Sequence, residues 1–371
     1  MNRWTQWASV WLVFLTVATR ADTASLAWKR AQHIQHGVST SEWFGTTGNY
    51  SPQQLRSYTT PADIEHIRQI GFDHIRIPVD PSIFNCDDPW EQCERVQILD
   101  QVITKAIELD LAVILDFHPD SQFTRQLAGS DMAVDLFVQL WGRIASHYAK
   151  YDPDRLIFEI MNEAESHDTY RWSGIEQRVL QEIRRQTPNF TVIVSGATWA
   201  DIWDLILLPP IADDNLIYSF HYYEPHIFTH QGASWGLPWW TNLHNLPFPS
   251  SPESVAPAVA AVADETTRWQ LTQYGFGRWN ADRIAGDIAF IADWAKRRNV
   301  PLICDEFGVY RNFSSPDARE RWLTAARTAF EKNHIGWTMW DYRGGFGVVR
   351  KQGQTITDDE GVLRALGLSR K

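Results

Sequence analysis

Basic side chains are in the minority in this 371-residue chain, which carries 34 Lys and Arg against 45 Asp and Glu, a formal net charge of −11. A protein that binds nucleic acid presents a basic face to the phosphates, so this balance argues against a nucleic-acid partner. With 44% hydrophobic and 21% charged residues, the chain also lacks the composition of disordered or low-complexity proteins. We therefore expect a folded protein with a substantial core.

Long apolar runs are scarce as well. The run Ala8–Ala18 has eleven residues, too few to cross a bilayer as a helix. Because Arg3 precedes this run and small residues follow it, residues 1–21 are expected to be a secretory signal peptide, and residues 22–371 a single folded domain. An N-terminal membrane anchor is the alternative. Cleavage would give a secreted or periplasmic protein without stable membrane association, which we expect to be a monomer.

Cysteine is the third scarce feature, with 3 residues. Cys86 and Cys93 lie close together in the polar stretch NCDDPWEQCE, a spacing that suggests a local disulfide in an exported protein. Zinc is the alternative, but no third and fourth ligand lie nearby in the sequence. Cys304 lies in an apolar run and is expected to be a buried free thiol.

Tryptophan, in contrast, is abundant, with 19 residues. Its large side chain is hard to bury completely. Some of these residues should pack in the core, and others should form surfaces that stack on flat apolar faces such as sugar rings.

Strand-like and helical patterns alternate along the chain. Helical spacing is clear, for example, in Leu99, Val102 and Ala106. Eight continuous apolar runs suit parallel strands that are covered on both faces. These runs are His36–Ser39, His74–Pro78, Ala112–Phe117, Leu156–Met161, Thr191–Ser195, Leu216–Phe220, Leu302–Asp305 and Ile335–Trp340. The eightfold alternation predicts an α/β fold, a single (β/α)₈ TIM barrel. A doubly wound open sheet is the alternative, but no Gly-x-Gly-x-x-Gly follows the first strand.

One connection is unusually long. About sixty residues after the sixth strand, from His221 to about Ala281, show no strong periodicity and are rich in proline and aromatic residues. Long loops in compact domains are usually functional or disordered, and the aromatic content argues against disorder. We expect this loop to form a wall or lid over the active face.

Polar or ionisable residues follow most of the predicted strands directly. Because barrel active sites lie at the carboxyl ends of the strands, these side chains should converge on one polar cleft. They are Arg76, His118, Asn162, Glu163, His221, Tyr223, Glu306 and Trp340.

Glu163 and Glu306 should face each other across the barrel mouth. Paired carboxyl groups are the minimum equipment for glycoside hydrolysis, one as a protonated acid and the other as an ionised nucleophile or base. Arg76 would keep Glu306 ionised by charge attraction, and apolar surroundings would raise the pKa of Glu163. Asp305 precedes Glu306 on a strand and is therefore expected to point away from it.

These residues, in this order and at these strand ends, resemble glycoside hydrolase family 5, the cellulase family of clan A. The resemblance covers Gly37 to about Leu368 and implies a retaining mechanism with Glu163 as acid/base and Glu306 as nucleophile. It assigns the remaining strand-end residues to the pocket of the reacting sugar. Asn162 would bond the 2-hydroxyl, His118 and His221 would line the pocket, Arg76 and Tyr223 would orient Glu306, and Trp340 would stack under the sugar.

The function that follows from this resemblance is secreted endo-β-glucanase activity on β-1,4 or mixed β-1,3-1,4 glucan, without metal or cofactor. A β-mannanase or an exo-acting β-glucosidase of the same family is the alternative. The tryptophans expected to line the cleft are Trp43, Trp235, Trp239 and Trp240. A metal hydrolase and a non-catalytic sugar-binding barrel are further alternatives. The first lacks a His-x-x-x-His pair and the second usually lacks one carboxylate, whereas both are present here.

Overall fold

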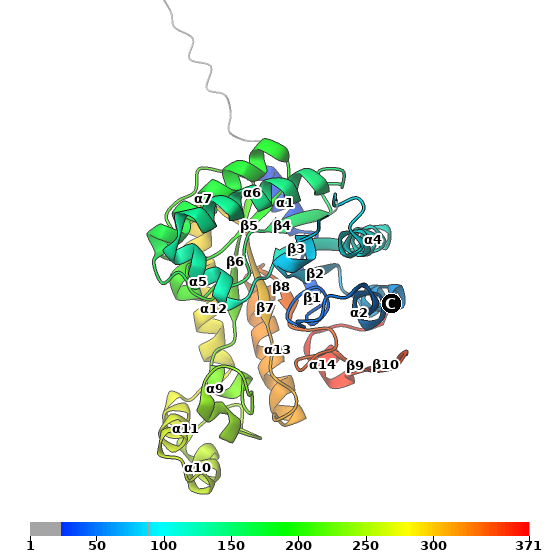
Figure 1. Ribbon diagram of the computed structural model, residues 1–371. Helices are drawn as coiled ribbons and strands as arrows, with labels where there is room; N and C mark the ends of the chain where they lie inside the picture. The colour runs from blue at the N-terminus through cyan, green and yellow to red at the C-terminus, as the bar shows by residue number, and fades with distance from the viewer. Residues whose placement is uncertain (1–23, 88, 371) are drawn as a thin grey trace, which may run out of the picture.

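A closed barrel of parallel strands, in the order β1 to β8, forms the centre of the computed structural model, which describes residues 24–87 and 89–370 (Figure 1). This closure confirms the predicted (β/α)₈ barrel. The predicted signal peptide, residues 1–21, lies outside the described residues. The strands are β1 (His36–Ser39), β2 (His74–Val79), β3 (Ala112–Phe117), β4 (Leu156–Glu159), β5 (Val192–Val194), β6 (Leu216–Tyr222), β7 (Leu302–Phe307) and β8 (Gly336–Met339).

Helices surround the barrel and connect its strands (Figure 1). Several begin with a proline in the first turn, where its missing N–H costs nothing. The helices are α1 (Ala24–Ala31), α2 (Pro52–Tyr58), α3 (Pro61–Gln69), η1 (Pro81–Phe84), α4 (Glu94–Glu108), α5 (Ser121–Gly129), α6 (Asp131–Tyr148), α7 (Thr169–Gln186), α8 (Ile202–Leu205), α9 (His226–Thr229), η2 (Pro238–Asn242), α10 (Pro252–Ala261), α11 (Glu265–Gly277), α12 (Ala281–Arg298), α13 (Pro316–Lys332) and α14 (Glu360–Ala365).

Inside the barrel, toward the amino ends of the strands, apolar side chains form a small separate core. Ile114, Ile157, Ile217 and Ile303 from four strands pack together there, and α1 contributes Ala27 to the same cluster. Helix α1 therefore packs against the inward-facing residues of the barrel, and alternation along each strand places the next inward residues nearer the carboxyl end.

The connection between β6 and β7 is helical, contrary to the expectation of a segment without regular structure. It contains α9, η2, α10 and α11, and Figure 1 shows α10 and α11 in a lobe that projects from the barrel. Ser251 caps α10 and Asp264 caps α11 through side-chain acceptors. Because Trp269 and Phe276 of α11 are exposed, the helix lacks the clean apolar stripe by which sequence periodicity is recognised.

After β8 the chain forms an antiparallel hairpin of β9 (Val349–Gln352) and β10 (Thr355–Asp358), followed by α14. Elsewhere, Cys86 and Cys93 form a disulfide beside the start of α4, and Cys304 is a buried free thiol. Within the described residues, no helix combines the length and the hydropathy that crossing a bilayer requires.

Candidate active site

A cleft of about 1210 Å³ opens at the carboxyl ends of the barrel strands. All but one of the predicted strand-end residues contribute to its wall. They are His118, Asn162, Glu163, His221, Tyr223, Glu306 and Trp340. The exception is Arg76, which is fully buried and contacts Glu306 directly. The barrel thus brings together residues that lie up to 264 positions apart, from Arg76 to Trp340.

Glu306 is held by two donors, one on each carboxylate oxygen. Arg76 Nη1 donates to Oε2 at 3.0 Å, and the Tyr223 hydroxyl donates to Oε1 at 2.8 Å. Burial, and then the neighbouring Glu306, raise the pKa of Tyr223, so its hydroxyl stays protonated as a donor. Glu306 is therefore fixed in one orientation toward the cleft, with a guanidinium against one oxygen and a hydroxyl against the other.

Arg76 also joins a layer of buried acids beneath the cleft. Its guanidinium binds both oxygens of Glu159 at 2.7 and 2.8 Å, Asn162 Oδ1 at 2.8 Å and Asp116 Oδ2 at 3.0 Å. One cation cannot neutralise every acid around it. Burial raises the pKa of Asp116 to about 7 and that of Glu159 to about 7, while the attraction of Arg76 opposes this rise.

Glu163 lies in a different environment, because no Lys or Arg of the described chain forms an ion pair with it. Its Oε1 is 2.8 Å from Nδ1 of His221, and burial raises its pKa. Burial also lowers the pKa of His221 to about 4, so the imidazole is neutral at neutral pH. The two glutamates thus lie in unlike environments, because burial raises the pKa of Glu163 whereas Glu306 contacts the Arg76 guanidinium.

His118 and Trp340 form a stacked wall of the same cleft. Their rings lie 5.7 Å apart at an angle of 13°, and Asp116 holds His118 through Nδ1 at 2.8 Å. Burial lowers the pKa of His118 to about 4. This pair offers a flat, uncharged face to a ligand next to the carboxyl groups.

The expectation that Asp305 points away from the site is wrong, because β7 is irregular at this point. Phe220 pairs with Cys304 but His221 pairs with Glu306, so Asp305 has no partner on β6. Alternation from the inward-facing Ile303 turns Asp305 into the barrel, and the bulge turns Glu306 to the same side. Both acids therefore face the interior, Asp305 one step below Glu306.

The aromatic predictions divide into three outcomes. Trp235 lines the cleft and is 47% exposed. Trp43 is 1% exposed and donates its indole N–H to the Leu55 carbonyl, so the expectation that it binds a ligand is wrong. Trp239 packs against the core outside the cleft lining, whereas Trp240 lines the cleft as Trp235 does.

Several residues of the site escaped the sequence reasoning. Trp199 and Tyr310 line the cleft, and Glu159 binds Arg76 below it. Glu159 stands four positions before Glu163 in the apolar run of β4, and an ionisable residue inside such a run was a usable signal. Trp199 and Tyr310 lie in loops, where no periodic pattern marks them.

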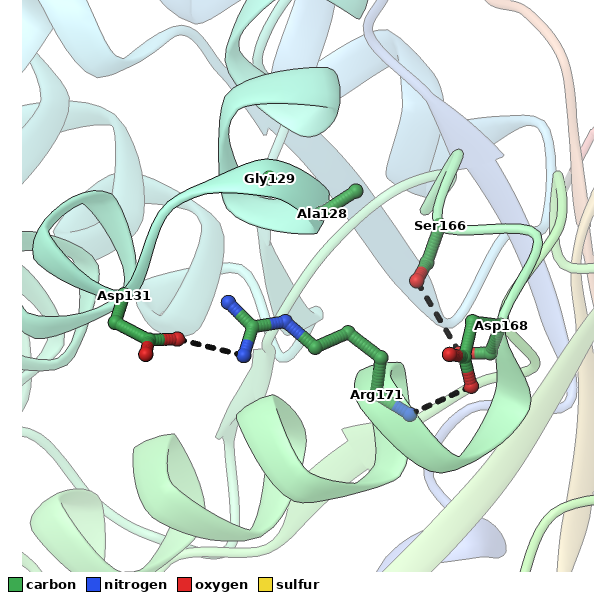
Figure 2. A pocket seen from close by; sticks show the side chains of 6 residues that line it. All are labelled: Ala128, Gly129, Asp131, Ser166, Asp168 and Arg171. Atoms are coloured by element: carbon green, nitrogen blue, oxygen red, sulfur yellow. Dashed lines mark hydrogen bonds and ion pairs between the residues drawn. The ribbon is translucent and has the colours of Figure 1, made fainter.

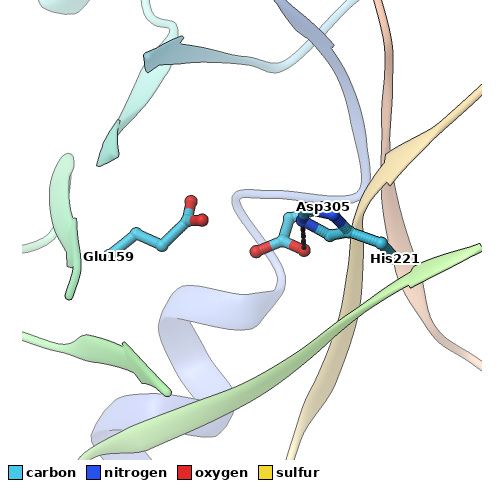
Figure 3. A group of neighbouring side chains, drawn as sticks. All are labelled: Glu159, His221 and Asp305. Atoms are coloured by element: carbon cyan, nitrogen blue, oxygen red, sulfur yellow. Dashed lines mark ion pairs between the residues drawn. The ribbon is translucent and has the colours of Figure 1, made fainter. Parts of the chain in front are cut away.

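Within residues 24–87 and 89–370, two groups of side chains have donor atoms close enough for a metal ion. Glu163, His221 and Glu306 each offer an atom within 4.8 Å of the others, and so do Glu159, His221 and Asp305 (Figure 3). In the first group, however, both oxygens of Glu306 already accept hydrogen bonds from Arg76 and Tyr223. A metal ion there would have to compete with the guanidinium.

A separate shallow hollow of about 490 Å³ lies between the α5–α6 junction and the start of α7 (Figure 2). Its charged groups pair with each other or cap the start of α7. Arg171 contacts Asp131 at 2.7 Å, and Asp168 caps α7 by accepting the Arg171 backbone N–H at 2.9 Å. We therefore assign the chemistry to the large cleft.

Comparison with known sequences agrees with this choice. Residues 33–345 match the profile of Cellulase (glycosyl hydrolase family 5). Endoglucanase 3 of Fibrobacter succinogenes is 27% identical over 97% of this chain, which spans 56% of that protein's length. Endoglucanase C of Acetivibrio thermocellus is 24% identical over 83% of this chain and 90% of its own.

A solved structure shares the architecture. The cellulose synthase subunit Z of Clostridioides difficile superposes with a TM-score of 0.72 and 25% identity, over 90% of this chain and 99% of its own. The family match covers most of the chain, including all of the strand-end residues. The chain belongs to glycosyl hydrolase family 5.

Proposed function

We propose that this protein is a secreted, retaining endo-β-glucanase that cleaves β-1,4 or mixed β-1,3-1,4 glucan by double displacement. One observation carries the proposal. An oxygen of Glu163 and an oxygen of Glu306 lie within 4.8 Å of each other in unlike electrostatic environments. Retaining glycosidases place their carboxyl groups about 5–5.5 Å apart, whereas inverting enzymes leave room for a water molecule between them.

In the first step, Glu306 attacks the anomeric carbon while Glu163 gives its proton to the departing glycosidic oxygen. The carbon–oxygen bond of the substrate breaks, and a glycosyl ester of Glu306 forms. In the second step, Glu163, now a carboxylate, takes a proton from water, and the water oxygen displaces Glu306. The raised pKa of Glu163 supports the acid role, and the contacts of Arg76 and Tyr223 with Glu306 support the nucleophile role.

The neighbouring residues fit the binding of one sugar between the two carboxyl groups. Asn162, whose Oδ1 accepts from Arg76, keeps its amide N–H groups available for a sugar hydroxyl. The His118–Trp340 wall offers a face for stacking.

The size and aromatic lining of the cleft support internal attack on a polymer. A volume of about 1210 Å³ exceeds the space that one sugar needs, and Trp199, Trp235 and Trp240 extend the lining beyond the carboxyl groups. An exo-acting β-glucosidase would need a pocket closed around the chain end.

The charge of the lining supports a neutral glycan. Among the described residues that line the cleft, none is Lys or Arg, and the acids are Glu42, Glu163, Glu165, Asp201, Glu224, Glu306 and Asp341. Like charges repel, so an anionic polysaccharide would bind poorly here.

Export and metal independence complete the proposal. The apolar run at residues 8–18 and the Cys86–Cys93 disulfide are typical of an exported protein. Two carboxyl groups suffice for the reaction, and the ligand atoms of Glu306 are engaged by Arg76 and Tyr223. Activity that persists after chelation is the expected result, and abolition by chelation would favour a metal hydrolase.

The test is hydrolysis of a substrate panel by the wild type, Glu163→Gln and Glu306→Gln. We expect rapid loss of viscosity with soluble β-1,4 and mixed-linkage glucans, and neutral derivatives to be cleaved faster than carboxymethyl cellulose. Preference for mannan would indicate a β-mannanase, and preference for aryl glucosides an exo-acting β-glucosidase. Wild-type activity in Glu306→Gln would refute the proposed mechanism.

A further inference from the structure

His221 stands between the candidate acid/base and a second, deeper carboxyl group. Its Nδ1 is 2.8 Å from Glu163 Oε1, and its Nε2 is 3.5 Å from Asp305 Oδ1. Figure 3 shows Asp305 beside the imidazole, with Glu159 on the opposite side of the barrel interior. Both His221 and Asp305 are buried, at 6% and 0% exposure. The ring therefore bridges the cleft and the acid layer below it.

The bulge in β7 creates this contact. A regular strand would direct only one of two consecutive residues into the barrel, but here both Asp305 and Glu306 face inward. Strand β7 thus serves both carboxyl groups of the reaction. It carries the candidate nucleophile, Glu306, and it also carries Asp305, which lies next to His221, the residue that contacts Glu163. A bulge beside an active site commonly redirects a side chain in this way.

The state of His221 matters because a neutral imidazole has one donor and one acceptor nitrogen. If the proton is on Nδ1, the ring donates to Glu163. If it is on Nε2, the ring accepts a hydrogen bond from protonated Glu163 and holds the catalytic proton away from the substrate. Since burial lowers the pKa of His221 to about 4, the neutral tautomers are the relevant states.

The surroundings of Asp305 favour its protonated form. Burial raises its pKa well above the ordinary range, and the nearby acids Glu159 and Asp116 raise it further, whereas Arg76 and the Ser219 hydroxyl lower it. Arg76 forms ion pairs with Glu159, Asp116 and Glu306, and in the described part of the chain it forms none with Asp305. A protonated carboxyl group is a donor.

We propose that Asp305 is a positioning residue: its carboxyl group, 3.5 Å from Nε2 of His221 in this structure, moves within hydrogen-bond distance, donates to Nε2 and so keeps the ring proton on Nδ1, facing Glu163. This inference rests on the proposed function, because it assigns a role to Glu163 in both steps. In the first step, the Nδ1–H group occupies Oε1 and leaves the acid proton on Oε2 for the glycosidic oxygen. In the second step, the same donor stabilises the carboxylate that accepts a proton from water. No proton passes through His221, so Asp305 and His221 are unchanged over the cycle.

The experiment compares Asp305→Asn, Asp305→Leu and the matched control Cys304→Ala, which changes the adjacent buried residue of β7. An asparagine amide donates to Nε2 at every pH, so Asp305→Asn should keep kcat within about threefold of wild type. Asp305→Leu removes the donor. We expect kcat to fall tenfold or more, KM to stay within twofold, and the basic limb of the kcat/KM profile to move to higher pH, since the Glu163 carboxylate loses its fixed donor.

A direct readout uses the wild-type protein with ¹⁵N-labelled histidine, whose ring nitrogen shifts report the tautomer of His221. A proton on Nδ1 is the expected result. A proton on Nε2, or a wild-type pH profile in Asp305→Leu, would overturn the inference. If Asp305→Leu does not fold, the wild-type spectrum and Asp305→Asn still decide the question. Failure of the proposed function is distinct, because it would appear as retained hydrolysis in Glu163→Gln and Glu306→Gln.

Discussion

The hydroxyl of Tyr223 offers a sharp test of how Glu306 is held. It donates to Glu306 Oε1 at 2.8 Å, and both side chains are buried, at 7% exposure each. A hydrogen bond to a charged group contributes about 1.5–3 kcal/mol. Tyr223→Phe removes this bond and little else, so Glu306 is no longer held in the attacking orientation, and we expect the barrier for forming and breaking its bond to the sugar to rise by up to this amount.

At about 1.4 kcal/mol for each factor of ten, a rise of this size corresponds to a decrease in kcat of about ten- to a hundredfold. The assay is steady-state hydrolysis of a soluble β-1,4-glucan and an aryl cellobioside, with thermal unfolding measured on the same samples. KM should change little, because the hydroxyl contacts the carboxylate and is not assigned to the sugar.

Tyr222→Phe is the matched control for this variant. Tyr222 is the adjacent residue, but its hydroxyl donates to Asp287 at 2.9 Å, on the helix side of β6. Its loss should cost stability and leave kcat near the wild-type value. Activity of Tyr223→Phe within twofold of wild type, or an equal loss in both variants, would refute the reasoning.

Three further variants test the energetics of the fold and the cleft. Burial raises the pKa of Glu176 from 4.5 to about 8, so the protonated form stabilises the fold at low pH and this contribution is lost as the pH rises. In urea unfolding, the stability of Glu176→Gln relative to wild type should therefore increase by about 1.4 kcal/mol for each pH unit between 4.5 and 8. A stability difference that does not change with pH would contradict this. Replacing Cys86 and Cys93 by serine removes a disulfide between cysteines that are 7 positions apart and should lower the free energy of unfolding by about 2 kcal/mol. An unchanged urea midpoint would show that the disulfide adds no stability. Trp235→Ala should raise KM for long oligosaccharides about three- to tenfold, whereas Trp239→Ala, outside the cleft lining, should leave KM unchanged. Equal KM values in the two variants would show that Trp235 does not bind the substrate.

The barrel was predictable because its pattern is simple. Strands buried on both faces read as continuous apolar runs, and the helices between them carry regular stripes. The carboxyl end of each run then marks the active face, so the sequence alone was enough to predict that Arg76, Glu163 and Glu306 lie together. Two of the eight strands have the predicted bounds, and the other six differ by one or two residues at an end, as for β6, which continues to Tyr222.

The remaining features depend on tertiary contacts that leave little trace in the sequence. The bulge that lets both Asp305 and Glu306 face the barrel interior arises from how β7 pairs with both neighbours, whereas strict alternation allows only one of two consecutive residues to face inward. Trp43 was expected in the cleft because it follows the first strand, but its indole finds a carbonyl partner in the core. The helices of the β6–β7 insertion lack a strong stripe because part of their aromatic surface is exposed.

The stereochemistry of the first product tests the central claim most directly. Proton NMR of the reducing end released from a soluble β-1,4-glucan, recorded before mutarotation, distinguishes the two anomers. Double displacement through Glu306, with Glu163 as acid and then base, predicts that the β-anomer appears first and the α-anomer grows in later. Initial release of the α-anomer would mean direct attack by water and would contradict the assignment of Glu306 as the nucleophile.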